Sequence, residues 1–356
     1  MPPARSGIAD YSNWLVRELR RQAEVEVNPA TPAGRAVYHI GNNHLHREIY
    51  QIALARPGVV VIHDAVLHHF YLGMLSEPAY VEEFVYNYGE WSRGLAIELW
   101  RNRRRSGADA RYFQYPMLRR IAETAECVVV HNRGAAELVL RHAPSARIVE
   151  VPHLYEPSGW VDPVMVERLR ASWGARPSSC VFGVFGHLRE AKRIAVTVRA
   201  FERVRAGNPK VFLLLAGAAG SLDMERALAR YSEIPGVIRV GHTPEEDFFA
   251  MCAAVDAGIN LRYPSAGETS GITIRLMGMG KPVIVSDGGE TSSIPVGACL
   301  KVPVNPAEEA MLAEYMRFLA GNRGHRLNIG RLAAEHIEEH QSIGTVVKKY
   351  LDILVS

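Results

Sequence analysis

Short apolar runs alternate with longer amphipathic stretches along most of the chain, and this alternation constrains the fold more than any other feature. Several apolar runs, such as "VVVIHDAV" (59–66) and "CVVVHN" (127–132), are continuous in β-branched residues rather than alternating. Continuous runs are typical of strands covered on both faces, as in parallel sheets. Strands separated by single helices predict βαβ units and a doubly wound α/β sheet. In the C-terminal half of the chain, the expected strands are 180–186, 211–217, 237–242, 257–261 and 281–287.

The N-terminal half shows the same pattern, with strands expected at 59–66, 127–132 and 147–153. One long helix is expected from 82 to about 105. The pattern restarts after "YEPSGWVDP" (155–163), and 356 residues are enough for two domains. We therefore expect two α/β domains, residues 1–155 and 156–340, and a C-terminal helix in 341–356 that packs back on the first domain.

Composition narrows the class of partner. A formal net charge of +3 favours anionic ligands mildly. No run approaches the roughly 20 apolar residues of a membrane span, and the N-terminus lacks the features of a signal peptide. Four widely spaced cysteines without a CxxC pair argue against a zinc site or a disulfide framework, so a reducing cytoplasm is expected. Basic residues are scattered, which argues against a nucleic-acid partner.

The stretch "YPSAGETSGITIRLMGMGKPVIVSD" (263–287) carries the most specific chemical signal. A loop leaves one expected strand and enters a helix at about Gly271, with Thr269 and Ser270 available as caps. The free amides of the first helical turn form an anion site. Glu268 fits such a site if it points past the anion to sugar hydroxyls. The alternative is a well-capped helix with an ordinary first-turn glutamate.

A second stretch, "FGVFGHLREAKRI" (182–194), places basic side chains where a strand turns into a helix. Arg189, Lys192 and Arg193 suit a diphosphate, because charge-assisted bonds to phosphate are strong. The alternative is a solvated, basic helix start. Positive charge at a helix N-terminus opposes the helix dipole, so the functional interpretation is favoured. The basic run 101–107 is interpreted instead as a solvated helix end, or as a contact with acidic lipid or an anionic acceptor.

Two further stretches lie in the N-terminal half. "PPARSGIADYSNWL" (2–15) begins an amphipathic helix, and Gly7 would let a ligand approach its first turn, although a plain N-cap explains it equally. His63 and Asp64 follow a buried strand, where a histidine can donate to a sugar hydroxyl or a developing charge. With His68 they suggest a metal only weakly, because a fourth ligand is missing. We therefore expect no metal.

Together these stretches resemble the group-1 family of retaining GT-B glycosyltransferases over nearly the whole chain. "PPARSGIADYS" looks like the family's N-terminal glycine loop, "VVIHD" like its histidine-bearing strand end, and "FGHLREAKR" like its phosphate-binding turn. "GHTPEEDFFAMCAAVDAGINLRYPSAGETSGITIRLMGMGKPVIVSD" looks like its nucleotide-sugar signature. The resemblance implies two Rossmann-like domains facing across a cleft, an acceptor-side domain in 1–155 and a nucleotide-sugar-binding domain in 156–340.

The resemblance also implies roles for individual residues. In the catalytic set, His63 contacts the transferred sugar near the reacting carbon, Glu268 orients it, and Lys192 binds the diphosphate. His187 occupies the position of the family's usual arginine. His242 and Thr243 lie where the base is met. The full donor-binding set is Gly7, His187, Arg189, Lys192, His242, Thr243, Glu268, Thr269, Ser270, Gly271 and Arg275.

The chain departs from the family pattern at three points. Arg275 stands at the second glutamate of the family's pair, with the spacing one residue short, and this leaves the ribose contact and the donor open. Arg189 stands in for the arginine missing at His187. The family also has a first strand before the glycine loop, whereas this sequence starts at Met1-Pro2, so either the chain lacks that strand or the recorded sequence omits it.

The expected activity is transfer of a sugar, with retention, from a nucleotide-diphosphate donor to a hydroxyl of a sugar, lipid-linked or small-molecule acceptor. A UDP-sugar is favoured and a GDP-sugar comes next. We expect no cofactor, and a cytoplasmic location that extends to the inner face of the membrane. His44, His68 and Tyr86 are unranked acceptor candidates. The alternatives are an epimerase or sugar phosphorylase of the same fold, and a non-catalytic nucleotide-sugar-binding subunit.

Overall fold

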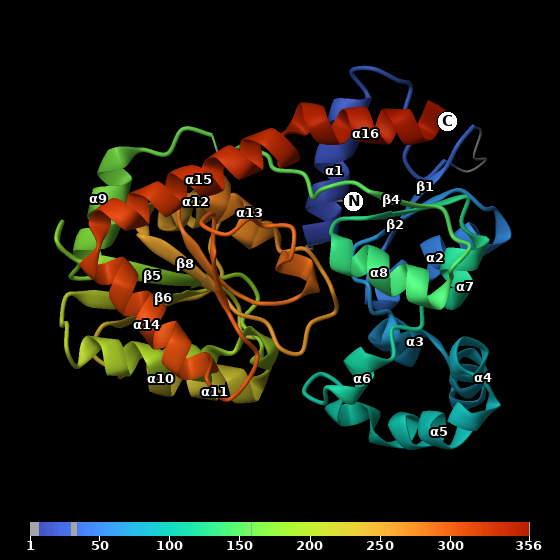
Figure 1. Cartoon of the computed structure of the whole chain (residues 1–356), viewed down its shortest axis with the longest axis horizontal. Helices are drawn as coiled ribbons and strands as arrows, with labels where there is room; N and C mark the ends of the chain where they lie inside the picture. Colours follow the sequence, from blue (N-terminus) through green and yellow to red (C-terminus); the bar gives the residue numbers. More distant parts are fainter. Residues whose placement is uncertain (1–6, 30–33, 158, 356) are drawn as a thin grey trace. The chain divides into compact units, whose positions relative to one another are not determined.

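The computed structural model describes residues 7–29, 34–157 and 159–355. It divides into two compact units, each considered by itself below. Unit 1 comprises Met1–Leu154, Pro264–Thr269 and His340–Ser356, and unit 2 comprises Tyr155–Tyr263 and Ser270–Glu339. Each unit contains one parallel sheet in its described part (Figure 1). The residues 2–6 of the predicted glycine loop lie outside the described residues.

The sheet of unit 1 has the strand order β1-β2-β3-β4. Its strands are β1 (Val37–Ile40), β2 (Val59–Ile62), β3 (Cys127–Val130) and β4 (Ile148–Glu150). All residues of β2 and β3 are buried, as their continuous β-branched runs predict. The three predicted strands exist, and each is shorter than its predicted range.

Helices cover both faces of this sheet because successive strand residues point to opposite sides. Val59 and Val61 pack with α1 (Gly7–Leu19) and α16 (Ile343–Val355). These two helices lie side by side, and the buried hydroxyls of Tyr11 and Tyr350 are 2.9 Å apart (Figure 1). The other face packs against helices that include α2 (Arg47–Ala55), α3 (His68–Met74), α7 (Arg119–Thr124) and α8 (Arg133–His142).

The prediction of one long helix from 82 to 105 is wrong. The segment forms α4 (Glu77–Tyr88) and α5 (Arg93–Asn102), followed by the 3-10 turn η3 (Arg103–Arg105). Gly89 separates the helices with φ +90° and ψ 166°, a conformation that is essentially restricted to glycine. The 3-10 turn η2 (Glu90–Ser92) then redirects the chain. The remaining elements of this part are η1 (His44–His46) and α6 (Arg111–Gln114).

The sheet of unit 2 has the strand order β10-β9-β8-β5-β6-β7, all parallel. Its strands are β5 (Cys180–Phe185), β6 (Val211–Ala216), β7 (Val237–Val240), β8 (Ala257–Asn260), β9 (Val283–Ser286) and β10 (Leu300–Val302). The first five confirm the predicted strands, whereas β10 was not predicted. The winding direction reverses between β5 and β8. In open α/β sheets, ligands bind beyond the carboxyl ends of the strands at such a switch point.

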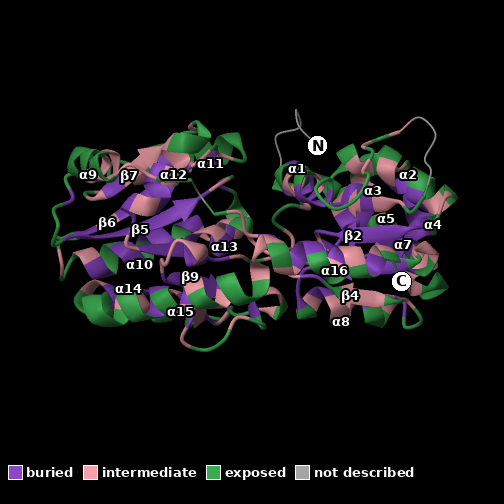
Figure 2. Ribbon diagram, turned by 90° about the horizontal axis from the view of Figure 1, so that it is seen from above, coloured by how far each residue is buried: buried purple, intermediate pink, exposed green. Residues whose placement is uncertain are grey.

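Both faces of this second sheet are also covered, and Figure 2 shows buried strands beneath helices with exposed outer sides. Phe182 and Val184 of β5 pack with α10 (Ile194–Arg205) and α14 (Glu308–Gly321). Val181 and Phe185 belong to the cluster on the opposite face. The helices of unit 2 not yet named are α9 (Pro163–Ser172), α11 (Leu222–Tyr231), α12 (Glu245–Ala254), α13 (Gly271–Gly278) and α15 (Arg323–Gln341), with the 3-10 turns η4 (Glu190–Lys192) and η5 (Gly289–Thr291).

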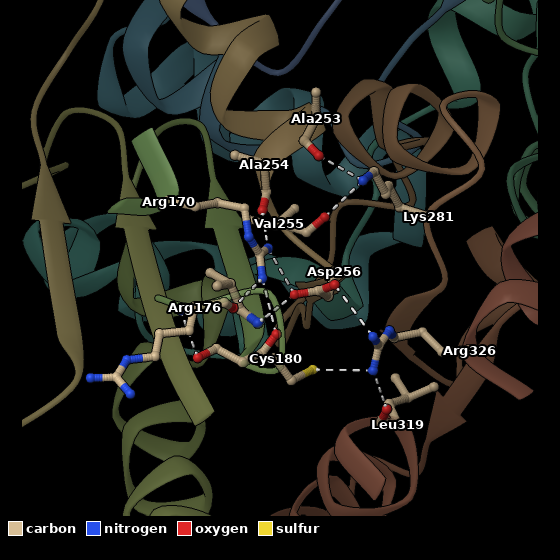
Figure 3. Close-up of polar contacts among 12 residues, drawn as sticks. Arg170, Arg176, Cys180, Ala253, Ala254, Val255, Asp256, Lys281, Leu319 and Arg326 are labelled. Carbon is tan, nitrogen blue, oxygen red and sulfur yellow. Dashed lines mark hydrogen bonds and ion pairs between the residues drawn. The ribbon is translucent and has the colours of Figure 1, made fainter. Parts of the chain in front are cut away.

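The amino-terminal edge of the β5–β8 pair is held by an ion-pair network (Figure 3). The Asp256 carboxylate accepts hydrogen bonds from Arg170 Nη1 and from the Val181 amide, each at 2.9 Å, and pairs with Arg326 at 3.4 Å. Lys281 Nζ donates to two carbonyls at the carboxyl end of α12, where the helix dipole favours cations. The basic side chains at this edge are therefore committed to the fold.

Candidate functional site

Lys192 is the central cation at the carboxyl edge of unit 2. It ends η4, directly after β5, and is only 7% exposed. Its Nζ donates to the Phe185 carbonyl at 2.8 Å and to Asn260 Oδ1 at 3.2 Å, and both acceptors are neutral. Burial, and then the neighbouring cations Arg262 and Arg189, hold the pKa of Lys192 well below its usual value.

No carboxylate bonds or pairs with Lys192 among the described residues, in contrast to the cations around Asp256. A buried ammonium without a counter-charge is costly. A bound anion would supply that charge and make the protonated form favourable. Within the described part of the chain, the charge of this lysine is therefore left without a counter-charge.

Asn260, the last residue of β8, connects this lysine to helix α13. It is 6% exposed, and its Nδ2 donates to Ser270 Oγ at 3.0 Å and to Thr273 Oγ1 at 2.8 Å. An ammonium has only donors, so the amide oxygen must face Lys192 and the amide nitrogen must face the two hydroxyls. The sequence interpretation missed Asn260. The available signal was a polar residue at the end of an apolar run, at the edge where ligands bind.

Ser270 is the N-cap of α13, and its Oγ accepts from the Thr273 amide at 3.4 Å. Arg262 Nη2 also donates to this oxygen, at 3.3 Å. The Ile274 amide bonds the Ser270 carbonyl, whereas within the described chain the amides of Gly271 and Ile272 have no acceptor. The predicted helix start and its cap are thus confirmed, with Ser270 as the cap, and Arg262 contacts the capping hydroxyl.

The other basic residues of this turn divide into two groups. His187 and Arg189 are exposed, on a turn that packs tightly against the end of β6. A Cβ on Gly217, whose φ is +134°, would lie 1.9 Å from the Gly186 carbonyl oxygen. Partial burial, Arg189 and Lys192 lower the pKa of His187. Arg193, by contrast, which the sequence analysis considered for a diphosphate contact, pairs with the buried carboxylate of Glu308.

Arg193 also marks the start of α10 at Ile194. Its backbone adopts φ +56° and ψ 33°, a left-handed conformation that ends η4 and starts the α-helix. Such a conformation is uncommon for a residue other than glycine. The pairing with Glu308 of α14 contributes to holding it there.

Three predicted donor-binding residues lie further from Lys192 in the sheet or on α13. His242 and Thr243 follow β7, the edge strand two positions from β5. The Arg275 guanidinium lies 4.6 Å from the ring centroid of Phe249 and 5.4 Å from that of Phe248, on α12. Arg275 follows Gly271 by one helical turn, so both occupy the same side of α13.

In unit 1, Asn132 holds the loop that carries Glu268. Asn132 Oδ1 caps α8 at the Ala135 amide, while Nδ2 donates to the Gly267 carbonyl at 3.0 Å and to Thr269 Oγ1 at 2.9 Å. Gly267 has φ +72°, and its added Cβ would lie 3.0 Å from the Cβ of Ala65. Glu268 Oε2 accepts from the Ala266 amide at 2.9 Å, so its carboxylate is bound within its own loop.

His63 belongs to a chain of buried imidazoles. His131 Nδ1 lies 2.9 Å from the Val151 carbonyl oxygen, which can only accept, so this nitrogen carries a proton. In a neutral ring, His131 Nε2 then accepts from His63 Nδ1 at 3.2 Å, and His63 Nε2 accepts from His39 Nδ1 at 2.9 Å. One carbonyl therefore sets the tautomers of three rings.

Both ring nitrogens of His63 are used within this row of histidines, because His39 bonds one and His131 bonds the other. Burial is the main cause that lowers the pKa of all three histidines, to about 3 for His39 and about 4 for His131, and well below the usual value for His63. Tyr11 of α1 contacts the same rings, with centroids 5.0 Å apart for His63 and for His131. Gly7 begins α1 and is exposed, and no atom of the described residues lies within 4 Å of the position that a Cβ would take there.

The metal alternative at His63, Asp64 and His68 does not match the geometry. His68 bonds the Tyr80 hydroxyl and the Tyr115 carbonyl, and Asp64 accepts from the Asn42 amide. The three side chains therefore serve different partners. Over residues 7–29, 34–157 and 159–355, no group of three or more histidine, cysteine or acidic residues could hold a metal ion.

Comparison with known proteins covers both halves of the chain. Residues 179–322 match the family model described as glycosyl transferases group 1. This segment is similar to the group 1 glycosyltransferases. It contains Lys192, Asn260, Ser270 and the whole of α13. No curated protein is similar enough in sequence to match.

Three solved structures are similar to nearly the whole chain. HepE from Anabaena, in complex with UDP-glucose, has a TM-score of 0.64 and 15% identity over 89% of this chain and 78% of that one. WaaG, a glycosyltransferase involved in lipopolysaccharide biosynthesis, has a TM-score of 0.61 and 15% identity over 98% and 96%. Sucrose-phosphate synthase from Thermosynechococcus elongatus has a TM-score of 0.60 and 16% identity over 89% and 72%. The chain therefore has the GT-B fold.

Proposed function

We propose that this chain is a glycosyltransferase that moves a hexose from a nucleotide-diphosphate sugar to an acceptor hydroxyl with retention. The observation that carries the proposal is Lys192, a buried cation without a counter-charge at the switch point of a parallel sheet. It lies in the segment that matches the group 1 family, and nucleotide-sugar donors are what that family uses. A UDP-sugar is the favoured donor, in line with the UDP-glucose complex of HepE.

In the proposed reaction the bond between the sugar and the diphosphate breaks through an oxocarbenium-like transition state. Negative charge then accumulates on the leaving diphosphate. Lys192, Arg189 and Arg262, with the outward amides of Gly271 and Ile272, would stabilise that charge. Fixed donors in a site that excludes water are worth more than solvated ones, because they need no reorganisation as the charge develops.

Several assignments remain parts of this proposal. Gly7, His187, His242, Thr243, Glu268, Thr269 and Arg275 are proposed as further donor contacts. His63 would reach a sugar hydroxyl only if one of its bonds to His39 or His131 opens, and Glu268 only if it leaves the Ala266 amide. The acceptor is proposed as a sugar, lipid-linked or small-molecule hydroxyl. The buried, unpaired cysteines favour a reducing compartment.

A thermal-shift series tests the donor class. UDP, GDP, ADP and dTDP, each with and without its sugar, are added to the full chain, because a ligand of the folded state raises the melting temperature by mass action. We expect UDP compounds to give the largest shift. Lys192→Gln should abolish it, whereas Lys210→Gln, which removes an exposed lysine of the same unit, should leave it unchanged. Equal shifts for both variants, or none for any nucleotide, would overturn the proposal.

The second candidate is a non-catalytic nucleotide-sugar-binding subunit. It is favoured by Arg275, which stands at the family's second glutamate and stacks on Phe249 instead of accepting from ribose hydroxyls. Such a protein would show the nucleotide-dependent shift without turnover across a panel of sugar, lipid and phenolic acceptors. Donor isomerisation without any acceptor would instead indicate an epimerase.

A further inference from the structure

The hydrogen bonds that connect Lys192 to α13 through Asn260 also fix which group donates and which accepts at each step. Lys192 Nζ donates to Asn260 Oδ1, and Asn260 Nδ2 donates to the hydroxyls of Ser270 and Thr273. Each link fixes the direction of the next, because an ammonium cannot accept and an amide oxygen cannot donate. The protonated lysine therefore sets the amide orientation, and the amide makes both hydroxyl oxygens acceptors.

Ser270 is the member that a ligand can reach. Its oxygen receives donors from Asn260, from Arg262 and from the Thr273 amide, and the residue is half-buried. A hydroxyl oxygen has two lone pairs, and these donors occupy them. Its own hydrogen has no acceptor among the described residues. The hydroxyl is thus left as a donor, beside the first-turn amides of α13, which are also donors.

We propose that Asn260 is a positioning residue that orients the Ser270 O–H toward the bound diphosphate and keeps Lys192 at the end of β5. This rests on the proposed anion site. With a carboxylate at 260, both hydroxyls would donate inward, and the Ser270 oxygen would turn a lone pair to the ligand. Hydrogen bonds to charged groups are worth about 1.5–3 kcal/mol, so the direction of this single hydroxyl changes affinity about tenfold or more.

Asn260→Asp tests the proposal because it preserves shape and reverses hydrogen-bond direction. Binding of UDP and of inorganic pyrophosphate to the full chain is measured by calorimetry. We expect Asn260→Asp to raise both dissociation constants at least tenfold, and Ser270→Ala to raise them about tenfold. Ser270→Thr, which keeps both the cap and the hydroxyl, should bind as the natural chain does.

A double-mutant cycle separates orientation from the added negative charge. The double variant combines Asn260→Asp with Ser270→Ala. If Asn260 acts through Ser270, this variant should bind UDP and pyrophosphate no more than about twofold worse than Asn260→Asp alone, because Asn260→Asp has already removed the Ser270 hydroxyl as a donor. Fully multiplicative effects, or unchanged binding by Ser270→Ala, would overturn the assignment. If Asn260→Asp does not fold, Asn260→Ser, which removes the amide without adding charge, takes its place in the cycle.

Comparing UDP with pyrophosphate separates the role proposed for Asn260 from the proposed nucleotide-sugar function. Pyrophosphate that binds and follows the cycle while UDP does not would support the role of Asn260 and reject the nucleotide donor. UDP that binds equally to the natural chain and to Ser270→Ala would leave the donor class standing and reject the role of Asn260. If neither ligand binds the natural chain, both proposals fail.

Discussion

Acid should destabilise unit 1, because below about pH 6.5 several of its histidines stay neutral in the folded state but become protonated in the unfolded state. Burial is the first cause that lowers the pKa of His39 and His68 to about 3 and that of His131 to about 4. In the unfolded chain the same rings titrate near pH 6.5, so below that pH the unfolded state binds more protons. Their contribution is therefore complete above about pH 6.5 and is lost as the pH falls toward the folded pKa values.

The size of the effect follows from the distance between the working pH and the unfolded pKa. At pH 5 each of these rings costs about 2 kcal/mol relative to neutral pH, since one pKa unit is about 1.4 kcal/mol. Three such rings cost about 6 kcal/mol, against a total stability of about 5–15 kcal/mol for a typical domain. The urea midpoint should fall steeply between pH 6.5 and pH 5.

His131→Gln makes this prediction specific. A glutamine amide can donate to the Val151 carbonyl and accept from His63 Nδ1, but it does not titrate. Urea unfolding followed by circular dichroism should give a pH slope smaller by about 1 kcal/mol per pH unit between pH 6 and pH 5. His242→Gln, at an exposed histidine of unit 2, is the matched control and should keep the natural slope. A stability that is flat from pH 7 to pH 5, or an unchanged slope in His131→Gln, would refute the reasoning.

Four other expectations can be checked directly. Asn132→Asp keeps the cap of α8 but loses the donors to Gly267 and Thr269, so hydrogen exchange should quicken in the loop while stability falls by about 1–3 kcal/mol; unchanged loop exchange would contradict this. Diphosphate binding should raise the lowered pKa of Lys192 and weaken as the pH rises, seen by calorimetry at a series of pH values. Asp256→Ala should cost about 3–5 kcal/mol in urea, because partly buried arginines lose their partner. Gly89→Ala should lower stability by about 1–3 kcal/mol, and an equal melting temperature would count against the strain at its φ of +90°.

The elements of this fold follow largely from local pattern. Continuous apolar runs mark strands with two covered faces, and this information is present in each run without its neighbours. The same holds for α13, whose start at Ser270-Gly271 is a matter of adjacent residues. Two strands were not predicted, β1 with four residues and β10 with three. The break at Gly89 escaped because helical periodicity continues on both sides of it.

The residues of the candidate site fall into those that local sequence predicted and those that it did not. Lys192, Ser270 and Gly271 were predicted, because basic and capping residues near strand ends have a local meaning. Asn260 and Arg262 were missed. The significance of Asn260 comes from partners 68 residues before it and 10 and 13 residues after it, brought together by the pairing of β5 with β8.

By itself, the sequence determined that the chain forms parallel sheets, roughly where their strands lie, and that one helix begins with a capped N-terminus. Only the tertiary structure decided which cations remain uncompensated: Arg193 finds Glu308 and Arg170 finds Asp256, whereas Lys192 finds only neutral oxygens. The physical reason is that the meaning of a charge depends on its burial and on its neighbours in space. Neither can be read from the residues beside it in the chain.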